Sequence, residues 1–187
     1  MRTILNINEK WTFLKEMSKV PVDMPESAEI INLPHTWNAK DGQDGGNDYF
    51  RGSCCYVKKI GKSELPEGEK YFLEINGANN SAEVYVNGKK LAHHDNGYST
   101  WRVDVTGALE ESNTIEITVD NAPTELVYPQ TADFTFYGGL YRDVNIIAVK
   151  EENEKEEKIQ ALVKALKSDE IKEYIEKTYD GAVIPFE

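Results

Sequence analysis

The chain has 187 residues, of which 40% are hydrophobic and 10% aromatic, enough for the core of one domain with a modest remainder. Its 33 acidic residues outnumber the 21 basic ones, giving a formal net charge of -12. This charge argues against a nucleic acid or an anionic membrane as partner, because binding to polyanions requires clustered Lys and Arg. No apolar run approaches the roughly 18 residues that a membrane-spanning helix needs.

The N-terminal residues 1–11 lack the basic and apolar regions of a signal peptide. The two cysteines, Cys54 and Cys55, are adjacent. Neighbouring residues in a strand point to opposite faces, so a disulfide between them is not expected, and one thiol should lie in the core with the other on the opposite face of the sheet. We therefore expect a cytoplasmic protein, or a mature chain from which a leader has been removed.

A hydrophobic period of two runs from about Ile30 to Val149, where short alternating runs are separated by turn residues. This pattern is typical of an all-β sandwich or barrel, and the lack of intervening helical runs excludes a doubly wound fold. Asn87-Gly88 supplies the positive-φ positions of a tight hairpin turn. The alternating apolar positions are Tyr71, Leu73 and Ile75; Ala82, Val84 and Val86; Trp101, Val103 and Val105; Ile115, Ile117 and Val119; and Val144, Ile146 and Ala148.

The run at 144–149 is apolar on both faces, because Ile147 and Val149 alternate with the inward residues. A strand with two covered faces belongs in the interior of a sheet, so we expect it to be central. A further run extends from Cys54 to Ile60, and weaker ones lie near Trp11 and Ile30. Together these runs predict about eight or nine strands.

The composition changes near Lys150. Residues 150–158 are almost entirely charged and include no apolar residue, as in a solvated linker or a fraying helix start. We therefore predict a β domain at residues 1–150, followed by a charged linker and a short α-helical tail at residues 151–187.

Two short helices are predicted in this tail. Ser168 is a suitable N-cap for the second helix, and Gly181 is placed to end it. Apolar residues recur at helical spacing, as Ile159, Leu162, Val163 and Leu166 in the first helix and Ile171, Tyr174 and Ile175 in the second.

Six separated segments of the β region carry short motifs of turn, aromatic and alternating apolar residues: 33–38 (LPHTWN), 49–56 (YFRGSCCY), 82–88 (AEVYVNG), 97–106 (GYSTWRVDVT), 113–121 (NTIEITVDN) and 133–144 (DFTFYGGLYRDV). In this order they resemble the N-terminal domain of glycoside hydrolase family 2, the family of β-galactosidases and β-glucuronidases. Cys55 stands where the family usually has a Trp, a difference that should alter packing only. The resemblance implies the family's jelly-roll β-sandwich, a galactose-binding-like domain.

Hydrolysis in this family uses two glutamates at strand ends of a (β/α)8 barrel, and such a barrel takes roughly 250 residues. The 187 residues leave no room for it. We therefore expect no catalytic residue and no activity in this chain alone, although it resembles part of a β-glycosidase. The predicted function is that of a non-catalytic sugar-binding or structural domain. The alternatives are a stand-alone carbohydrate-binding module and an assembly module that acts through the helical tail.

Three residues are candidates for substrate contact. The resemblance implies that Asp133 is the acid that this domain projects toward the active site in some family members, where it contacts a sugar hydroxyl and, in certain β-galactosidases, a monovalent cation. A carboxylate suits both roles, although an Asp in a loop also commonly caps a turn. His35 could contact sugar or only bond to backbone. Tyr137 could stack on a sugar of the β-galactoside or β-glucuronide class, or belong to the core or an interface.

No other cofactor and no metal site is expected. His93 and His94 alternate faces on a predicted strand, so they cannot chelate one metal together.

The tail from Ala161 onward resembles the extreme C-terminus of methionine-binding lipoproteins. The sequence contains no ligand-binding lobes of such a receptor, so amino-acid binding is not implied. An apolar stripe on short helices is unstable in water, so it must pack on the sandwich or on another copy of the chain. A homo-oligomer formed through the tail is therefore one expected arrangement.

Overall fold

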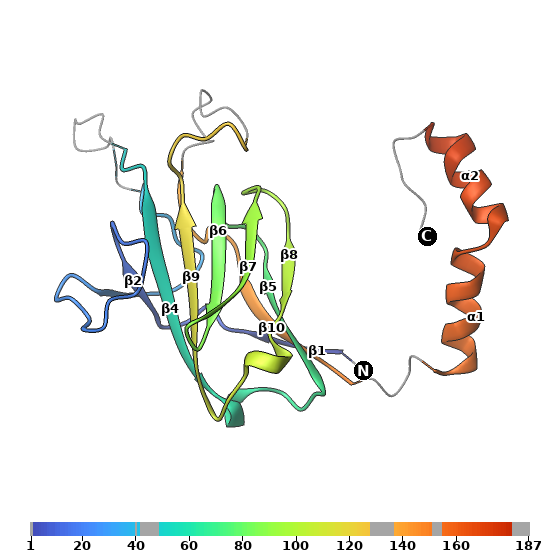
Figure 1. Ribbon diagram of the computed structural model, residues 1–187, viewed down its shortest axis with the longest axis horizontal. Coiled ribbons are helices and arrows are strands. Elements are labelled where there is room, and N and C mark those ends of the chain that lie inside the picture. The colour runs from blue at the N-terminus through green and yellow to red at the C-terminus, as the bar shows by residue number, and fades with distance from the viewer. Residues whose placement is uncertain (1, 40, 42–48, 128–136, 151–154, 181–187) are drawn as a thin grey trace. The chain divides into compact units, whose positions relative to one another are not determined.

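The computed structural model describes residues 2–39, 41, 49–127, 137–150 and 155–180. The chain divides into two compact units, Arg2–Val149 and Lys150–Glu187. The first unit is a β-sandwich and the second contains the two helices (Figure 1). Within the described residues, no helix has the length and apolarity to cross a membrane.

The sandwich consists of two antiparallel sheets. One sheet has the order β1 (Arg2–Asn6), β10 (Val144–Val149), β5 (Lys70–Ile75) and β8 (Trp101–Asp104). The other has the order β3 (Glu29–Ile31), β2 (Trp11–Leu14), β4 (Ser53–Gly61), β9 (Ser112–Asp120), β6 (Ser81–Val86) and β7 (Lys89–Asp95). Two 3-10 turns, Lys62–Glu64 and Thr106–Ala108, lie in the connections. The predicted all-β sandwich with a short helical tail is confirmed.

The core forms between the facing sheets because each strand points alternate side chains inward. In β9 the odd-numbered residues Ile115, Ile117 and Val119 are fully buried, while their neighbours are partly exposed. In β6 the buried residues are Ala82, Val84 and Val86, as the alternation predicts. Burial of this apolar surface is the main stabilising contribution to the sandwich.

The β6–β7 hairpin turns at Asn87-Gly88, whose φ angles of 52° and 77° are those of the predicted tight turn. Strand β10 pairs with β1 on one side and β5 on the other, and it is buried along most of its length, so its predicted central position is confirmed. Cys54 lies in the main core and Cys55 in a smaller cluster on the other face of the sheet, both as free thiols.

The described residues form ten strands rather than the predicted eight or nine. The missed strand is β1, an edge strand in which only Leu5 packs against the core, so its sequence shows no clear alternation. This difference illustrates why an exposed edge strand is harder to predict than an interior one.

In the tail, α1 spans Glu157–Leu166 and α2 spans Asp169–Tyr179. The hydroxyl of Ser168 accepts a hydrogen bond from the backbone N–H of Ile171 at 3.4 Å, as the predicted N-cap requires. The last described residue of α2's C-terminal end is Asp180, in the left-handed conformation with φ 43° and ψ 48°, and the predicted stop Gly181 lies outside the described residues. Asp and Asn tolerate this conformation better than other non-glycine residues, so Asp180 can end the helix.

The packing of the core gives a stability prediction. Replacing buried Ile117 with Ala should lower the free energy of unfolding by about 2–5 kcal/mol, through lost transfer energy and a residual cavity. The matched control is Ile30→Ala at a 69% exposed position, which should change stability by less than about 0.5 kcal/mol. Urea denaturation followed by tryptophan fluorescence measures both, and equal effects would contradict the assignment of the core.

Candidate functional site

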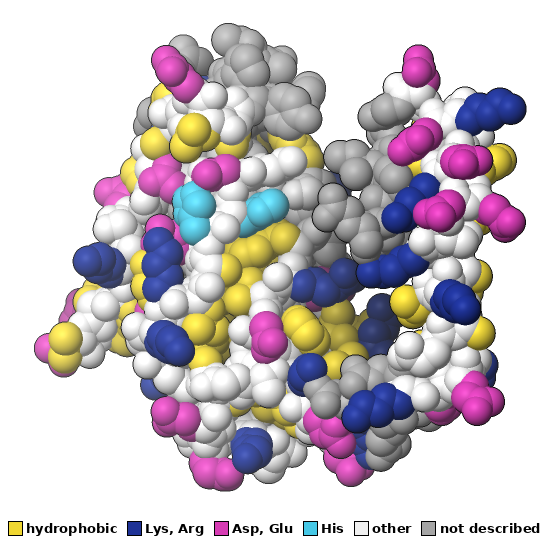
Figure 2. Space-filling view, turned by 45° about the vertical axis from the view of Figure 1, so that its right-hand side comes forward, with side chains coloured by type: hydrophobic (Ala, Val, Ile, Leu, Met, Phe, Trp, Pro, Cys, Tyr) yellow, Lys and Arg dark blue, Asp and Glu magenta, His cyan; other side chains and the backbone are white. Residues whose placement is uncertain are grey.

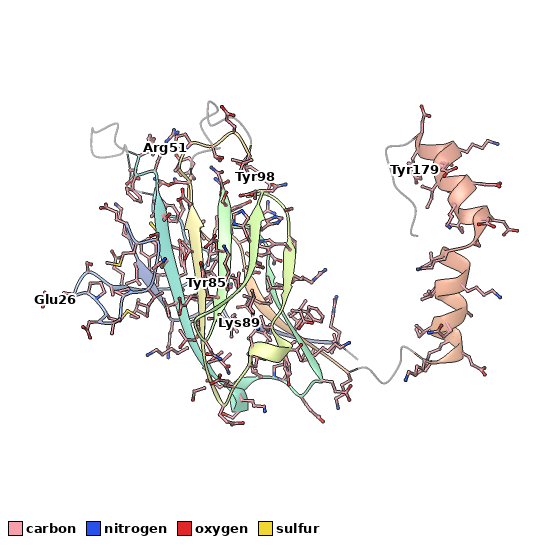
Figure 3. The ribbon with its side chains drawn as sticks, viewed as in Figure 1. Glu26, Arg51, Tyr85, Lys89, Tyr98 and Tyr179 are labelled. Carbon is pink, nitrogen blue, oxygen red and sulfur yellow. The ribbon has the colours of Figure 1, made fainter. Side chains whose placement is uncertain are left out.

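One end of the sandwich gathers parts of several segments that carried the family motifs. Figure 3 shows Arg51, just before β4, and Tyr98, just after β7, at this same end. We call it the loop end and define it by residues 35–39, 41, 49–52, 79–80, 96–98, 121 and 137–140. The hydrogen bonds between these segments come mainly from asparagine side chains, which are strong backbone partners when buried.

The carboxamide of Asn38 joins three of these segments. Its Oδ1 accepts from the backbone N–H of Gly138 at 2.7 Å and from Nδ2 of Asn121 at 3.2 Å. Its Nδ2 donates to Oδ2 of Asp41 at 2.6 Å and to the carbonyl of Phe50 at 3.0 Å. Since an amide has two donor hydrogens and two acceptor lone pairs, this buried group is fully satisfied.

Two glycines allow the 137–140 segment to lie directly against the 35–38 segment. A Cβ atom at Gly138 would come within 1.9 Å of the Trp37 ring, and one at Gly139 within 2.4 Å of the His35 carbonyl. Gly139 also has φ +134°, which other residues rarely adopt. The backbone N–H of His35 donates to the carbonyl of Leu140 at 2.8 Å, so the two motifs are joined along their backbones.

Asn79 also holds the 137–140 segment. Its backbone N–H and carbonyl exchange hydrogen bonds with Gly139 at 3.1 and 3.2 Å, and its Nδ2 donates to the carbonyl of Tyr137 at 2.7 Å. The Tyr137 side chain is 37% exposed and lies edge-to-face with Tyr49 at 6.0 Å between ring centroids. Tyr137 is therefore a partly exposed aromatic residue on a firmly held backbone.

His35 is half-buried. Its Nδ1 is 2.8 Å from the hydroxyl of Tyr56, and its ring contacts Phe13 at 4.7 Å between centroids. Burial lowers the pKa of His35, partly opposed by the negative charge of Glu29, so its neutral form is favoured. His35 lines a cavity of about 400 Å³, and Tyr137 does not. The sequence-predicted residues His35 and Tyr137 are therefore not brought together in this cavity.

Asp133, the third predicted contact, lies outside the described residues. The structure describes the chain again from Tyr137 to Lys150. Among the residues of the described ranges, no group of three or more His, Cys, Asp or Glu could hold a metal ion. The monovalent cation expected near Asp133 stays a prediction.

A second concave surface lies on the outer face of the six-stranded sheet, with a volume of about 430 Å³. Ser53, Asp120, Ser81 and Asp95 stand opposite one another on β4, β9, β6 and β7. Ser53 donates to Asp120, and Ser81 donates to Asp95 at 2.6 Å. Figure 2 shows histidine side chains beside acidic ones on the surface of the sandwich, and Nε2 of His93 is 2.8 Å from Asp95.

The carboxylates of Asp120 and Asp95 on this concave surface are thus hydrogen-bonded to neighbouring side chains. The Ser81 hydroxyl, and to a lesser extent His93, lower the pKa of Asp95, so it is charged at neutral pH. Ser53 bonds Asp120, and Ser81 bonds Asp95, each on a neighbouring strand. We therefore interpret these four residues as a network that stabilises the pairing of the strands. His94 lies on the other face, stacked on Trp101 at 4.8 Å, which agrees with the predicted separation of the two histidines.

Comparison with protein families places the sandwich among known domains. Residues 48–161 match the model of the glycosyl hydrolase 2 galactose-binding domain-like family. The chain belongs to this family. The match includes the hairpin at Asn87-Gly88 and the Gly138-Gly139 segment held by Asn38, so the sequence-based resemblance is confirmed.

Several relatives of this glycosyl hydrolase 2 domain are longer proteins that are named as enzymes. A putative beta-glucuronidase of Formosa agariphila is 36% identical over 162 residues, 84% of this chain and 20% of that protein. A beta-galactosidase of Thermoanaerobacter pseudethanolicus is 28% identical over 151 residues, 76% of this chain and 20% of that protein. The chain thus spans about a fifth of the length of these relatives.

Solved structures agree on the fold. An FMN-binding beta-glucuronidase from Facaelibacterium prausnitzii L2-6 superposes with a TM-score of 0.69 at 40% identity, over 80% of this chain and 23% of that one. A Bacteroides uniformis beta-glucuronidase superposes with a TM-score of 0.70 at 35% identity, over 80% of this chain and 18% of that one. The match therefore covers a galactose-binding-like domain rather than a whole hydrolase.

The methionine-binding lipoprotein MetQ of Bacillus subtilis is 56% identical over 41 residues, 22% of this chain and 15% of that protein. This short match gives partial support to the predicted resemblance of the tail. It covers too little of the lipoprotein to indicate its binding function.

Sequence reasoning missed the roles of Asn38, Asn79 and Asn121, although Asn38 and Asn121 lie within the quoted motifs. All three are buried, whereas most asparagines in loops are exposed. For Asn38 and Asn121 the available signal was their position directly after Trp37 and at the end of an apolar strand, respectively. Without the tertiary structure, however, their hydrogen-bond partners up to 100 residues away could not be identified.

Asn38 offers a test of the loop end. Asn38→Asp keeps the shape but removes both donors and places a carboxylate beside Asp41, so we expect a loss of about 3–5 kcal/mol of unfolding free energy. The control is Asn32→Asp, because exposed Asn32 uses only its oxygen, which accepts from the backbone N–H of Lys10, and Asp retains it. Chemical denaturation measures both, and an equally small effect would contradict the role of Asn38.

Proposed function

We propose that this glycosyl hydrolase 2 domain contacts a carbohydrate of the β-galactoside or β-glucuronide class through its loop end, with Asp133 and Tyr137 as contacts, and leaves hydrolysis to other residues. The observation that supports this most directly is the clamping of Tyr137–Gly139 by Asn38 and Asn79. A sugar contact must be held in place before binding, because ordering it afterwards reduces affinity.

Asp133 and Tyr137 would each play a defined chemical role in binding the sugar. Asp133 lies four residues before Tyr137 in the chain, and its carboxylate would accept hydrogen bonds from two neighbouring sugar hydroxyls. The same oxygens suit a monovalent cation, which would supply a positive partner for sugar oxygens. The exposed ring of Tyr137 offers an apolar face to the C–H side of a sugar and a hydroxyl at its tip. The names of the relatives support both sugar classes without choosing between them.

A titration tests this proposal. Methyl β-galactoside and methyl β-glucuronide are added to the ¹⁵N-labelled full chain, and we expect the amide signals of Tyr137 and Gly138 to shift. Asp133→Asn should weaken binding about tenfold, since it loses charged acceptors. The control Asp180→Asn removes one acidic charge at the end of α2 and should leave binding unchanged. Flat titrations with both sugars, or full binding by Asp133→Asn, would contradict the proposal.

A second role concerns the helical tail, for which we propose self-association between copies of the chain. No described residue of α1 or α2 is buried, and Leu162, Val163 and Tyr174 are 55%, 41% and 60% exposed. Helices of about ten residues are unstable alone in water, so pairing of their apolar stripes would stabilise them.

Light scattering on the full chain tests the tail. We expect a mass above that of the monomer, reduced to the monomer by Leu162→Glu with Leu166→Glu, because two charges would interrupt the stripe of α1. The control is Leu126→Glu on the sandwich, where the side chain is 75% exposed, and it should keep the wild-type mass. A monomeric wild-type chain at the highest soluble concentration would exclude this role.

A further inference from the structure

The hydrogen bond between Tyr56 and His35 fixes which ring nitrogen of His35 carries the proton. Tyr56 is fully buried, and burial raises the pKa of its hydroxyl, while a hydrogen bond from the backbone of Leu140 opposes that rise. The hydroxyl's own proton then needs an acceptor, because an unpaired buried O–H is costly.

Nδ1 of His35, at 2.8 Å, is the acceptor found for this proton among the described residues. Since neutral imidazole has one acceptor and one donor nitrogen, the proton of the ring resides on Nε2. No hydrogen-bond acceptor for Nε2 is found within the described part of the chain. His35 also lines the cavity of about 400 Å³, so Nε2–H is the ring donor available to a ligand there.

The other walls of this cavity combine aromatic and charged groups. Phe13 and Trp37 lie stacked, with 6.2 Å between ring centroids and 18° between their planes. Glu29, Lys15 and Asp41 bring charged groups to the lining. Asp41 is already engaged by the side chain of Asn38 and the backbone N–H of Phe50 at 3.1 Å. Glu29 is thus the carboxylate of this lining most free to accept from a ligand hydroxyl.

We infer that this cavity is a binding site for a neutral monosaccharide unit, in which Nε2–H of His35 donates to one sugar hydroxyl, Glu29 accepts from another, and Trp37 contacts the ring. The site goes beyond the proposed function, because it requires neither Asp133 nor Tyr137.

Size and charge define the ligand class. A volume of about 400 Å³ accommodates a single sugar ring. The lining carries one cation, Lys15, and two carboxylates, Glu29 and Asp41, so its net charge of 1 − 2 = −1 opposes an anionic uronic acid. A neutral hexoside should therefore bind more tightly than a glucuronide at this site.

The protonation state of His35 is measured first. Long-range ¹H–¹⁵N spectra of the full chain at neutral pH distinguish the two neutral forms of histidine, and His35 should give the pattern of the Nε2–H form. Tyr56→Phe removes the proton donated to Nδ1 and should produce a mixture of both forms. An Nδ1–H pattern in the wild-type chain would overturn the inference.

Sugar binding is measured in the same chain through its tryptophan side chains. The indole N–H of Trp37 donates to the Phe50 carbonyl at 3.3 Å and should shift on addition of methyl β-galactopyranoside. The indole signals of Trp11, buried in the core, and Trp101, stacked on His94, serve as internal references and should stay unchanged. Methyl β-glucuronide should produce the Trp37 shift only at several-fold higher concentration.

Variants of His35 separate its hydrogen bond from its bulk. His35→Phe keeps an aromatic ring but removes the donor, and it should weaken galactoside binding about tenfold. His35→Gln can place an amide N–H near the position of Nε2 and should recover part of the affinity. Equal binding by wild type and His35→Phe, with thermal unfolding showing both folded, would overturn the inference.

Two further variants distinguish this site from the proposed contacts at Asp133 and Tyr137. Tyr137→Ala and Asp133→Asn should leave the Trp37 shift unchanged, whereas Glu29→Gln should weaken it. Loss of the Trp37 shift in Tyr137→Ala or Asp133→Asn would show that the sugar is held by the Asp133 and Tyr137 contacts instead. A wild-type chain with no Trp37 shift at the solubility limit of the galactoside would exclude the cavity as a site, whatever the result at Tyr137.

Discussion

The buried carboxamide of Asn38 is the constraint on which the loop end depends. Four hydrogen bonds join it to Asp41, Phe50, Asn121 and Gly138, which lie up to 100 residues from Asn38 in the sequence. A buried amide with a missing partner is costly, so any displacement of one segment penalises the others. The geometry of this end is therefore set by one group whose hydrogen-bonding capacity is fully used.

The sandwich supplies the rigid support that this arrangement needs. Trp37 packs where Gly138 has no side chain, and Tyr56 on β4 reaches from the core to His35. The backbone of His35 thus helps to hold the 137–140 segment, while the Tyr56 hydroxyl orients its imidazole. A family motif with an apparently structural purpose can in this way also prepare a polar group for binding, since its proton is placed before a ligand arrives.

The two proposed sugar contacts differ in kind. The one at Asp133 and Tyr137 fits the chain's membership of the glycosyl hydrolase 2 galactose-binding-like family, whose relatives are named for glucuronides and galactosides. The one at His35 follows from the cavity beside β2 and favours a neutral sugar because of its net negative lining. The helical tail adds apolar surface of another type, suited to association between proteins.

The sequence alone determined the elements whose cause is local. Alternation predicted β6 and β9, Asn87-Gly88 predicted the hairpin, and Ser168 predicted the start of α2, since each depends on residues a few positions apart. The six motifs also identified the family. Only the tertiary structure decided the roles of Asn38, Tyr56 and His35, and it added the edge strand β1, because these depend on partners that are distant in sequence and adjacent only after folding.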